Sequence, residues 1–163
     1  MATKKVLLIG DNLLTKRAHE VTKFDKRLHA ILDDMKDTLF EYSGVGLAAP
    51  QIGIMRRIFI VDTGEEIIEC VNPQILETNG ENEGPEACLS VPGKQGVVTR
   101  PVWVKIGAYD RNGVYFEAEG EEYIARCFCH ENDHLDGKLF VELTKQLVDC
   151  DEIGYEEYYG DGE

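Results

Sequence analysis

The sequence predicts a single α+β domain in which mostly antiparallel strands pack around a late helix, with one amphipathic helix near the N-terminus. Three observations predict this fold class. Apolar residues recur at helical spacing over 25–44, strand-like segments fill the middle of the chain, and a second helical pattern runs from 120 to 134. The chain of 163 residues is long enough for one hydrophobic core and short for two.

The N-terminal helix is predicted by its apolar face and by its ends. Asp25 is a suitable N-cap, and Gly44 marks the exit. The apolar positions at helical spacing are Leu28, Ile31, Leu32, Met35, Leu39 and Phe40. The following segment "GVGLAAPQIG" (44–53) is rich in small residues, which indicates a tight backbone path packed closely against another element.

The strands are predicted from apolar runs and from alternation of apolar and polar residues. We expect "DRNG" to be a hairpin turn and "ETNGENEGPE" (77–86) to be an acidic loop. The expected strands are "RIFIVD" (57–62), "IIECVNP" (67–73), "PVWVKIGAYD", "GVYFEAEG" and a last strand "KLFVEL" (138–143).

Charge separates the chain into a predicted domain, 1–148, and an acidic C-terminal tail, 149–163. The tail holds seven acids and no base, so we expect it to be solvated, although Tyr155, Tyr158 and Tyr159 leave docking on the body open. The net charge of −14 argues against nucleic-acid binding through a broad basic surface. No apolar run is long enough to cross a bilayer, so no membrane association is expected.

The cysteines indicate a reducing compartment. Their count is odd and the N-terminal segment "MATKKVLLIGDN" does not have the pattern of a secretion signal, so we expect free thiols and a cytoplasmic location. The five are Cys70, Cys88, Cys127, Cys129 and Cys150. For each of them a small buried hydrophobe is the simplest interpretation.

The stretch "HENDH" within the late helical pattern is a candidate metal site. His130 and His134 are four residues apart, so on a helix both imidazoles point the same way, and Glu131 is close enough to manage the protons of a water. Two exposed histidines favoured by the dipole of a helix C-terminus are the alternative, until a third ligand is found.

A third ligand must come from upstream, because no histidine follows His134 and Glu142 falls in the expected last strand. His19 and His29 lie in or before the first helix, and nothing around them is distinctive. Cys88 stands out because it lies in the short turn-rich segment "EACLSVPG" between strands.

Three segments, "GVGLAAPQIG", "EACLSVP" and "CHENDHLDG", resemble in this order and spacing the three signature motifs of the peptide deformylases. The resemblance extends from about Gly10 to about Leu143. It implies a metal-dependent hydrolase that removes formyl from the N-terminal formyl-methionine of nascent polypeptides and releases formate, by attack of a metal-bound water.

The resemblance also implies roles for individual residues. Cys88, His130 and His134 match the metal ligands and Glu131 matches the general base. Gln51 and the backbone N–H of Leu89 match the donors to the oxyanion. The positions that match the substrate pocket and its surroundings are Gly46, Val45, Glu86, Arg100, Tyr123 and Cys127. Of these, Glu86 and Arg100 match a pair that in many members forms an ion pair near the site.

The resemblance implies one divalent ion per chain. In the family Fe²⁺ is the usual ion in the cell, and Zn²⁺, Ni²⁺ or Co²⁺ can replace it in purified protein. A thiolate and two imidazoles are equally compatible with zinc, so the ligand set alone does not select the metal.

The chain departs from the commonest family pattern at four places. Ala87 replaces a glycine, which would cost about 1 kcal/mol if φ were positive there, or would narrow the pocket rim otherwise. Cys129 replaces a glutamine, and we expect it to pack rather than to ligate. Asn132 replaces an apolar residue and indicates a more exposed helix edge. The acidic C-terminus argues against ribosome docking through a basic tail, and a transient ribosome contact stays open.

Two rival functions remain open from the sequence. One is a metallohydrolase on the same scaffold that acts on other acyl groups or as a peptidase. The other is a non-catalytic metal-binding or interaction protein. Glu131 and Gln51 argue against the second, because neither is needed merely to hold a metal.

Overall fold

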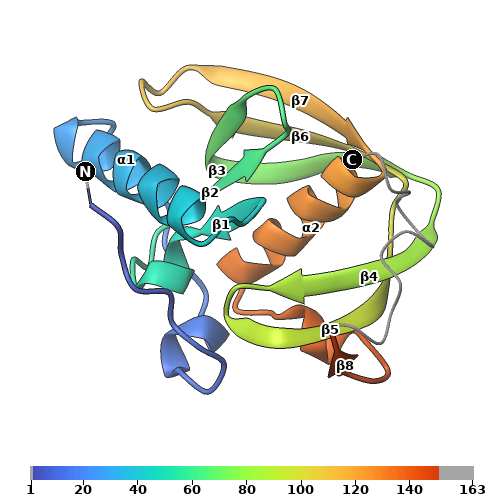
Figure 1. Cartoon of the computed structure of the whole chain (residues 1–163). Helices are drawn as coiled ribbons and strands as arrows, with labels where there is room; N and C mark the ends of the chain where they lie inside the picture. The colour runs from blue at the N-terminus through green and yellow to red at the C-terminus, as the bar shows by residue number, and fades with distance from the viewer. Residues whose placement is uncertain (1, 151–163) are drawn as a thin grey trace.

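The computed structural model describes residues 2–150 of the chain and has the predicted α+β fold, with two helices and two antiparallel sheets. The helices are α1 (Lys26–Glu41) and α2 (Tyr123–Leu135). In Figure 1, α2 runs between the larger sheet and the strands β4 and β5, while α1 lies at one side near the N-terminus.

The larger sheet has five strands. In spatial order they are β1 (Gly46–Ala48), β2 (Ile58–Asp62), β3 (Ile67–Asn79), β6 (Trp103–Tyr109) and β7 (Tyr115–Glu121). The smaller sheet contains β4 (Asn82–Cys88), β5 (Val91–Arg100) and β8 (Val148–Asp149). Short 3-10 turns occupy Asn12–Thr15, Ala49–Ile52 and Phe140–Glu142.

Strand β2 explains how the two helices are placed. Ile58 and Ile60 belong to the core cluster with the apolar stripe of α1, whereas Phe59 and Val61 belong to the cluster around α2. Because successive side chains of a strand point to opposite faces, the continuous apolar run of β2 indicates a sheet covered on both sides. Each helix therefore buries one face of the same sheet.

The predicted N-terminal helix is confirmed, including its N-cap. Asp25 accepts a hydrogen bond from the backbone N–H of Leu28 at 3.1 Å. Leu28, Leu32, Met35 and Leu39 are buried, but Phe40 is 89 % exposed. Phe40 follows Leu39 directly and so lies about 100° around the helix from it, outside the buried stripe.

The strand predictions were partly wrong around 77–86 and 138–143. The acidic segment is not a loop, because β3 extends to Asn79 and β4 begins at Asn82, with Gly80 at φ +73° where the chain crosses between sheets. The segment 138–143 is not a strand. Glu142 accepts a hydrogen bond from the N–H of Leu139 at 3.0 Å, which stabilises a 3-10 turn, and Leu139 and Phe140 enter the same core cluster.

The predicted boundary at 149 falls inside β8, where Val148 and Asp149 pair with Gln95 and Lys94 of β5. Residues 151–163 of the predicted acidic tail, with its three tyrosines, lie outside the described residues. Within the described part, no helix is long and apolar enough to cross a membrane.

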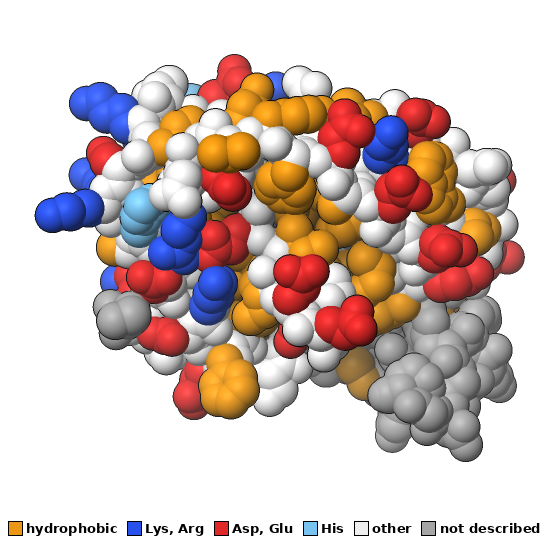
Figure 2. Space-filling view, turned by 90° about the horizontal axis from the view of Figure 1, so that it is seen from above, with side chains coloured by type: hydrophobic (Ala, Val, Ile, Leu, Met, Phe, Trp, Pro, Cys, Tyr) orange, Lys and Arg blue, Asp and Glu red, His pale blue; other side chains and the backbone are white. Residues whose placement is uncertain are grey.

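Surface charge agrees with the acidic composition. Figure 2 shows acidic side chains spread over the face seen from above, with apolar side chains between them. Among the described residues on that face, no continuous basic patch is visible, and the few basic side chains lie mostly toward one side.

Candidate active site and metal centre

Three side chains that could hold a metal ion meet where the end of β4 faces helix α2. Their ligand atoms, from Cys88, His130 and His134, all lie within 4.8 Å of one another, and all three residues are buried. The Cys88 Sγ atom is 3.4 Å from His134 Nε2. Within residues 2–150 this is the one such group of three, and the sequence predicted the same three residues.

The upstream histidines that the sequence left open lie elsewhere. The Nε2 atom of His29 is 2.8 Å from the carbonyl oxygen of Arg111, and His19 forms an isolated bridge with Arg56. Cys88 is therefore the upstream residue that the fold brings to the two histidines of α2.

Local structure explains why the three donors converge. His130 and His134 are one helical turn apart, and their rings meet edge to face with centroids 5.1 Å apart. Cys88 is the last residue of β4 and pairs with Val91, so it lies at the tip of a tight hairpin. The hairpin carries the thiol toward α2, whose phase is set by the apolar residues that it packs on the five-stranded sheet.

A buried carboxylate fixes the orientation of His130. Glu86 Oε1 is 2.9 Å from His130 Nδ1, and because an ionised carboxylate only accepts, Nδ1 carries the proton and Nε2 is left for a ligand. Arg100 donates to both oxygens of Glu86, at 2.7 and 3.0 Å. Burial raises the pKa of Glu86, but the hydrogen bonds from His130 and Arg100 outweigh it and lower the pKa to about 2.

Glu131 lies beside the three donors. It is buried, and its Oε1 atom has no hydrogen-bond partner among the described residues. Burial raises its pKa to about 7 and outweighs the nearby charges of His130 and Arg100, which lower it. A Cβ atom at Gly46 would be 2.6 Å from Glu131 Oε2, so only glycine lets this strand pass so close to the carboxylate.

The side-chain amide of Gln51 is held in a defined orientation. Its Oε1 accepts a hydrogen bond from the N–H of Ala48 at 2.9 Å. Its Nε2 donates to Ser90 Oγ at 3.1 Å and lies 3.5 Å from Cys88 Sγ. The amide N–H₂ group therefore points toward the three donors, of which the Cys88 thiol is in contact with it. There it can donate a hydrogen bond to an oxygen atom of a ligand.

A cavity of about 630 Å³ opens above these residues. The predicted site residues that line it are Val45, Gly46, Gln51, Glu86, Cys88, Leu89, Tyr123, Cys127, His130 and Glu131. Of the other two, His134 lies beside the Cys88 thiol and Arg100 lies behind Glu86. The fold thus brings all twelve predicted residues to one region.

The departures from the family pattern have structural outcomes. Ala87 does not have a positive φ, and it is exposed on the cavity rim, so its methyl group narrows the rim without backbone strain. Cys129 is buried in the core around α2, where burial raises its pKa to about 11. Asn132 is half-buried rather than at an exposed edge, and its Oδ1 has no partner among the described residues.

The sequence interpretation missed Arg126 and Ser90. Arg126 is buried and donates to Glu86 Oε2 at 2.9 Å. The signal that could have found it is a lone arginine in the apolar stretch "YIARCFC", four residues before His130 and hence on the same helix face. Ser90 has no comparable signal, because a serine in a turn is common.

Comparison with known proteins identifies what this arrangement resembles. The family profile described as polypeptide deformylase matches residues 3–149. A peptide deformylase of Lachnoclostridium phytofermentans is 48 % identical over 151 residues, covering 91 % of this chain and 93 % of that protein. One of Agathobacter rectalis is 50 % identical over 145 residues, covering 89 % and 92 %.

Solved structures of peptide deformylases are also similar to this chain. The crystal structure of a peptide deformylase from Legionella pneumophila has a TM-score of 0.87 and 44 % identity, covering 88 % of this chain and 87 % of that chain. The enzyme from Thermotoga maritima has a TM-score of 0.87 and 39 % identity, covering 90 % and 100 %. A peptide deformylase from Synechococcus elongatus in complex with actinonin has a TM-score of 0.84 and 34 % identity, covering 86 % and 78 %.

Proposed function

The chain belongs to the polypeptide deformylase family, and on that premise we propose how it works: it is a metal-dependent hydrolase that removes formyl from the N-terminal formyl-methionine of new polypeptides and releases formate. The observation that carries the proposal is the meeting of Cys88, His130 and His134 below a cavity, with a buried carboxyl group beside them.

The residues present fit a divalent metal ion. One thiolate and two neutral imidazoles form a three-donor set of the kind that leaves a fourth position open, and Glu86 fixes the ring of His130 from behind. We propose Fe²⁺ as the ion in the cell, with Zn²⁺, Ni²⁺ or Co²⁺ as replacements. When bound, such an ion supplies Lewis acidity that lowers the pKa of water and polarises a carbonyl group.

Glu131 is the proposed general base and acid. It takes one proton from the attacking water while the water oxygen bonds to the formyl carbon, and it passes that proton to the amine nitrogen as the C–N bond breaks. Formate and a free methionine amine result. The burial that raises its pKa also places Glu131 next to the three donors, at the position where this proton transfer is needed.

Gln51 and the backbone N–H of Leu89 are the proposed donors to the oxyanion that forms on the attacked carbonyl. The contacts of Gln51 with Ala48 and Ser90 hold its amide before substrate arrives, so little reorganisation is needed during reaction. Leu89 follows Cys88 in the hairpin and lines the same cavity.

The methionine side chain is proposed to enter the cavity beside α2. Val45, Tyr123 and Cys127 line it there, and Gly46 offers backbone to the formyl group. Burial raises the pKa of the Cys127 thiol, so this residue stays neutral and suits an apolar side chain. Glu86 and Arg100 are proposed to act behind His130 rather than on the substrate.

Nascent formylated polypeptides are the proposed partners, in the cytoplasm. The five free cysteines support a reducing compartment. Direct nucleic-acid binding is not expected at this net charge of −14, and any ribosome contact would not use a basic C-terminal tail.

The test is formate release from a formyl-Met-Ala peptide by protein purified without oxygen and loaded with iron(II). The Glu131→Ala variant should bind metal but lose about a thousandfold in rate. Acetyl-Met-Ala serves as the matched substrate and should be cleaved far more slowly, since a formyl carbon is less hindered. Metal-loaded protein that releases no formate would refute the proposal, and equal cleavage of the acetyl peptide would favour a broader acyl hydrolase.

A further inference from the structure

We propose that Arg126 is a positioning residue of the metal centre, which holds the β4–β5 hairpin with Cys88 at a fixed place relative to the helix with His130 and His134. The inference rests on the proposed function only in so far as these three residues take the metal. Arg126 lies in α2, one turn before His130.

The guanidinium of Arg126 binds several groups of the hairpin at once. Its side chain is 4 % exposed. One nitrogen donates to the carbonyl oxygen of Val98 at 2.7 Å, to Glu86 Oε2 at 2.9 Å and to the carbonyl oxygen of Gly84 at 3.4 Å. The other donates to the backbone and side-chain oxygens of Asn82, both at 3.2 Å. The side chain of Arg126 in α2 therefore hydrogen-bonds to both strands of the hairpin, β4 and β5.

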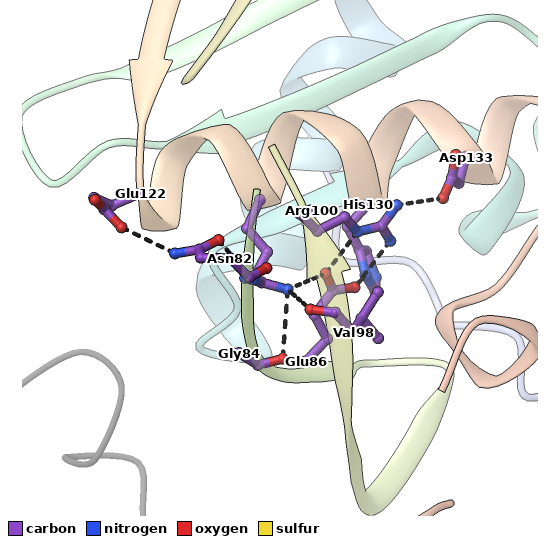
Figure 3. Close-up of polar contacts among 9 residues, drawn as sticks. Asn82, Gly84, Glu86, Val98, Arg100, Glu122, His130 and Asp133 are labelled. Carbon is purple, nitrogen blue, oxygen red and sulfur yellow. Dashed lines mark hydrogen bonds and ion pairs between the residues drawn. The ribbon is translucent and has the colours of Figure 1, made fainter. Parts of the chain in front are cut away.

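The hydrogen bonds of Arg126 involve residues that contact or neighbour the proposed metal ligands. Figure 3 shows Glu86, Arg100 and His130 joined between α2 and the two strands, with Asn82 continuing the network to Glu122. Glu86 receives Arg126 on one oxygen and His130 on the other. Since Cys88 is two residues beyond Glu86 in β4, a shift of the hairpin would move the thiol and turn the imidazole together.

An arginine suits this position better than a lysine or an apolar residue. Its five donors in a planar fork can bind backbone carbonyls and a carboxylate simultaneously, whereas a lysine offers three donors from a single atom. Glu86 already has Arg100 as a partner, so the second buried cation is not required for neutralisation alone. The additional hydrogen bonds of Arg126 instead fix the position of the β4–β5 hairpin relative to α2.

The experiment compares Arg126→Met and Arg126→Lys with the parent and with Arg111→Met. Arg111 is the matched control, because it also links a helix to a strand, by binding Asp33 of α1 and Glu69 of β3, but lies away from the three donors. The readouts are Zn²⁺ affinity by chelator competition, the absorption spectrum of the Co²⁺-loaded protein, and the urea midpoint. Arg126→Met should weaken Zn²⁺ binding about ten- to a hundredfold and shift the cobalt bands, and Arg126→Lys should restore part of both.

Arg111→Met should lower the urea midpoint and leave Zn²⁺ affinity within about twofold of the parent. Parent-like affinity and cobalt spectrum in both Arg126 variants would overturn the proposal, whatever their stability. If Arg126→Met does not fold, Arg126→Lys decides by the same two readouts. Formate is not measured, so failure of the proposed reaction would be seen separately from failure of this inference.

Discussion

Helices α1 and α2 cover opposite faces of one sheet, but they differ in where their charged residues lie. Helix α1 buries an apolar stripe of Leu28, Leu32, Met35 and Leu39 and turns its charged residues outward. Helix α2 buries charged residues and candidate metal ligands as well as apolar residues. Those buried polar residues are Arg126, His130, Glu131 and His134. Burying charged groups costs free energy unless each has a partner. We therefore infer that the buried polar residues of α2 serve the site, whereas the buried face of α1 serves packing.

The arginine networks of the two helices show the same contrast. Glu86 is almost fully buried between Arg100, Arg126 and His130. At α1, Arg111 from the β6–β7 turn binds Glu69 and Asp33, but its side chain is 26 % exposed. A buried charge that loses its partner is more costly than one that water can reach, so breaking the first network should destabilise the protein far more than breaking the second.

The largest expected effect comes from removing the thiol at the hairpin tip. Cys88→Ala deletes one of three donors, so bound metal should be lost and formate release should fall by at least about a thousandfold. Metal content and rate measure this. Cys129→Ala is the matched control: this cysteine is buried one residue before His130 but is outside the three-donor group. It should keep its metal at a stability cost of about 1 kcal/mol. Metal loss from Cys129→Ala instead would make Cys129 a ligand.

The next largest effect is expected at the centre of the buried network. Glu86→Gln keeps the size of the side chain but leaves two buried guanidinium groups without their shared charge, although Arg100 retains Asp133. The free energy of unfolding should fall by about 4 kcal/mol, measured by urea denaturation at neutral pH. A loss below about 1 kcal/mol would mean that the network behaves like a surface pair.

The comparison of the helices also shows what the sequence could predict. The N-cap Asp25 and the stripe of α1 follow from local rules, because a helix that packs by one face repeats its pattern every turn. The spacing of His130 and His134, together with the ordered motifs, predicts the candidate donors of α2. The turn-rich segment around Cys88 predicts that residue as the third donor, but only the fold shows that the hairpin tip with Cys88 reaches α2.

The misses have a common physical cause. Arg126 and the 3-10 turn at Phe140–Glu142 depend on contacts between distant parts of the chain. The apolar run "KLFVEL" fits a strand by composition, and only packing of Leu139 and Phe140 into one cluster decides otherwise. The local sequence pattern predicts which residues are buried, but the tertiary structure determines which residues they contact.

A substitution in the packed face of α1 tests whether that helix contributes to stability alone. Leu32 is fully buried in the cluster that joins α1 to β2. Leu32→Ala should lower the free energy of unfolding by about 3 kcal/mol, because it removes apolar contacts and leaves a cavity. The rate of formate release per folded molecule should stay at the parent level. A large fall in that rate, with metal still bound, would show that α1 also shapes the site.

The smallest expected effect is at the half-buried network of Arg111, Glu69 and Asp33, and it depends on pH. Burial raises the pKa of Glu69, but hydrogen bonds from Arg111 and Lys36 outweigh it and hold the pKa below its usual 4.5. A lowered folded-state pKa contributes stability above the unfolded-state value, and that stability is lost as pH falls from about 4.5 through the folded-state pKa. Glu69→Gln should therefore cost about 0.5 kcal/mol at pH 7, and the difference from the parent should shrink as the medium becomes more acidic. Urea midpoints of the two proteins between neutral and acidic pH measure this, and a difference that stays constant would mean that Glu69 acts through packing rather than charge.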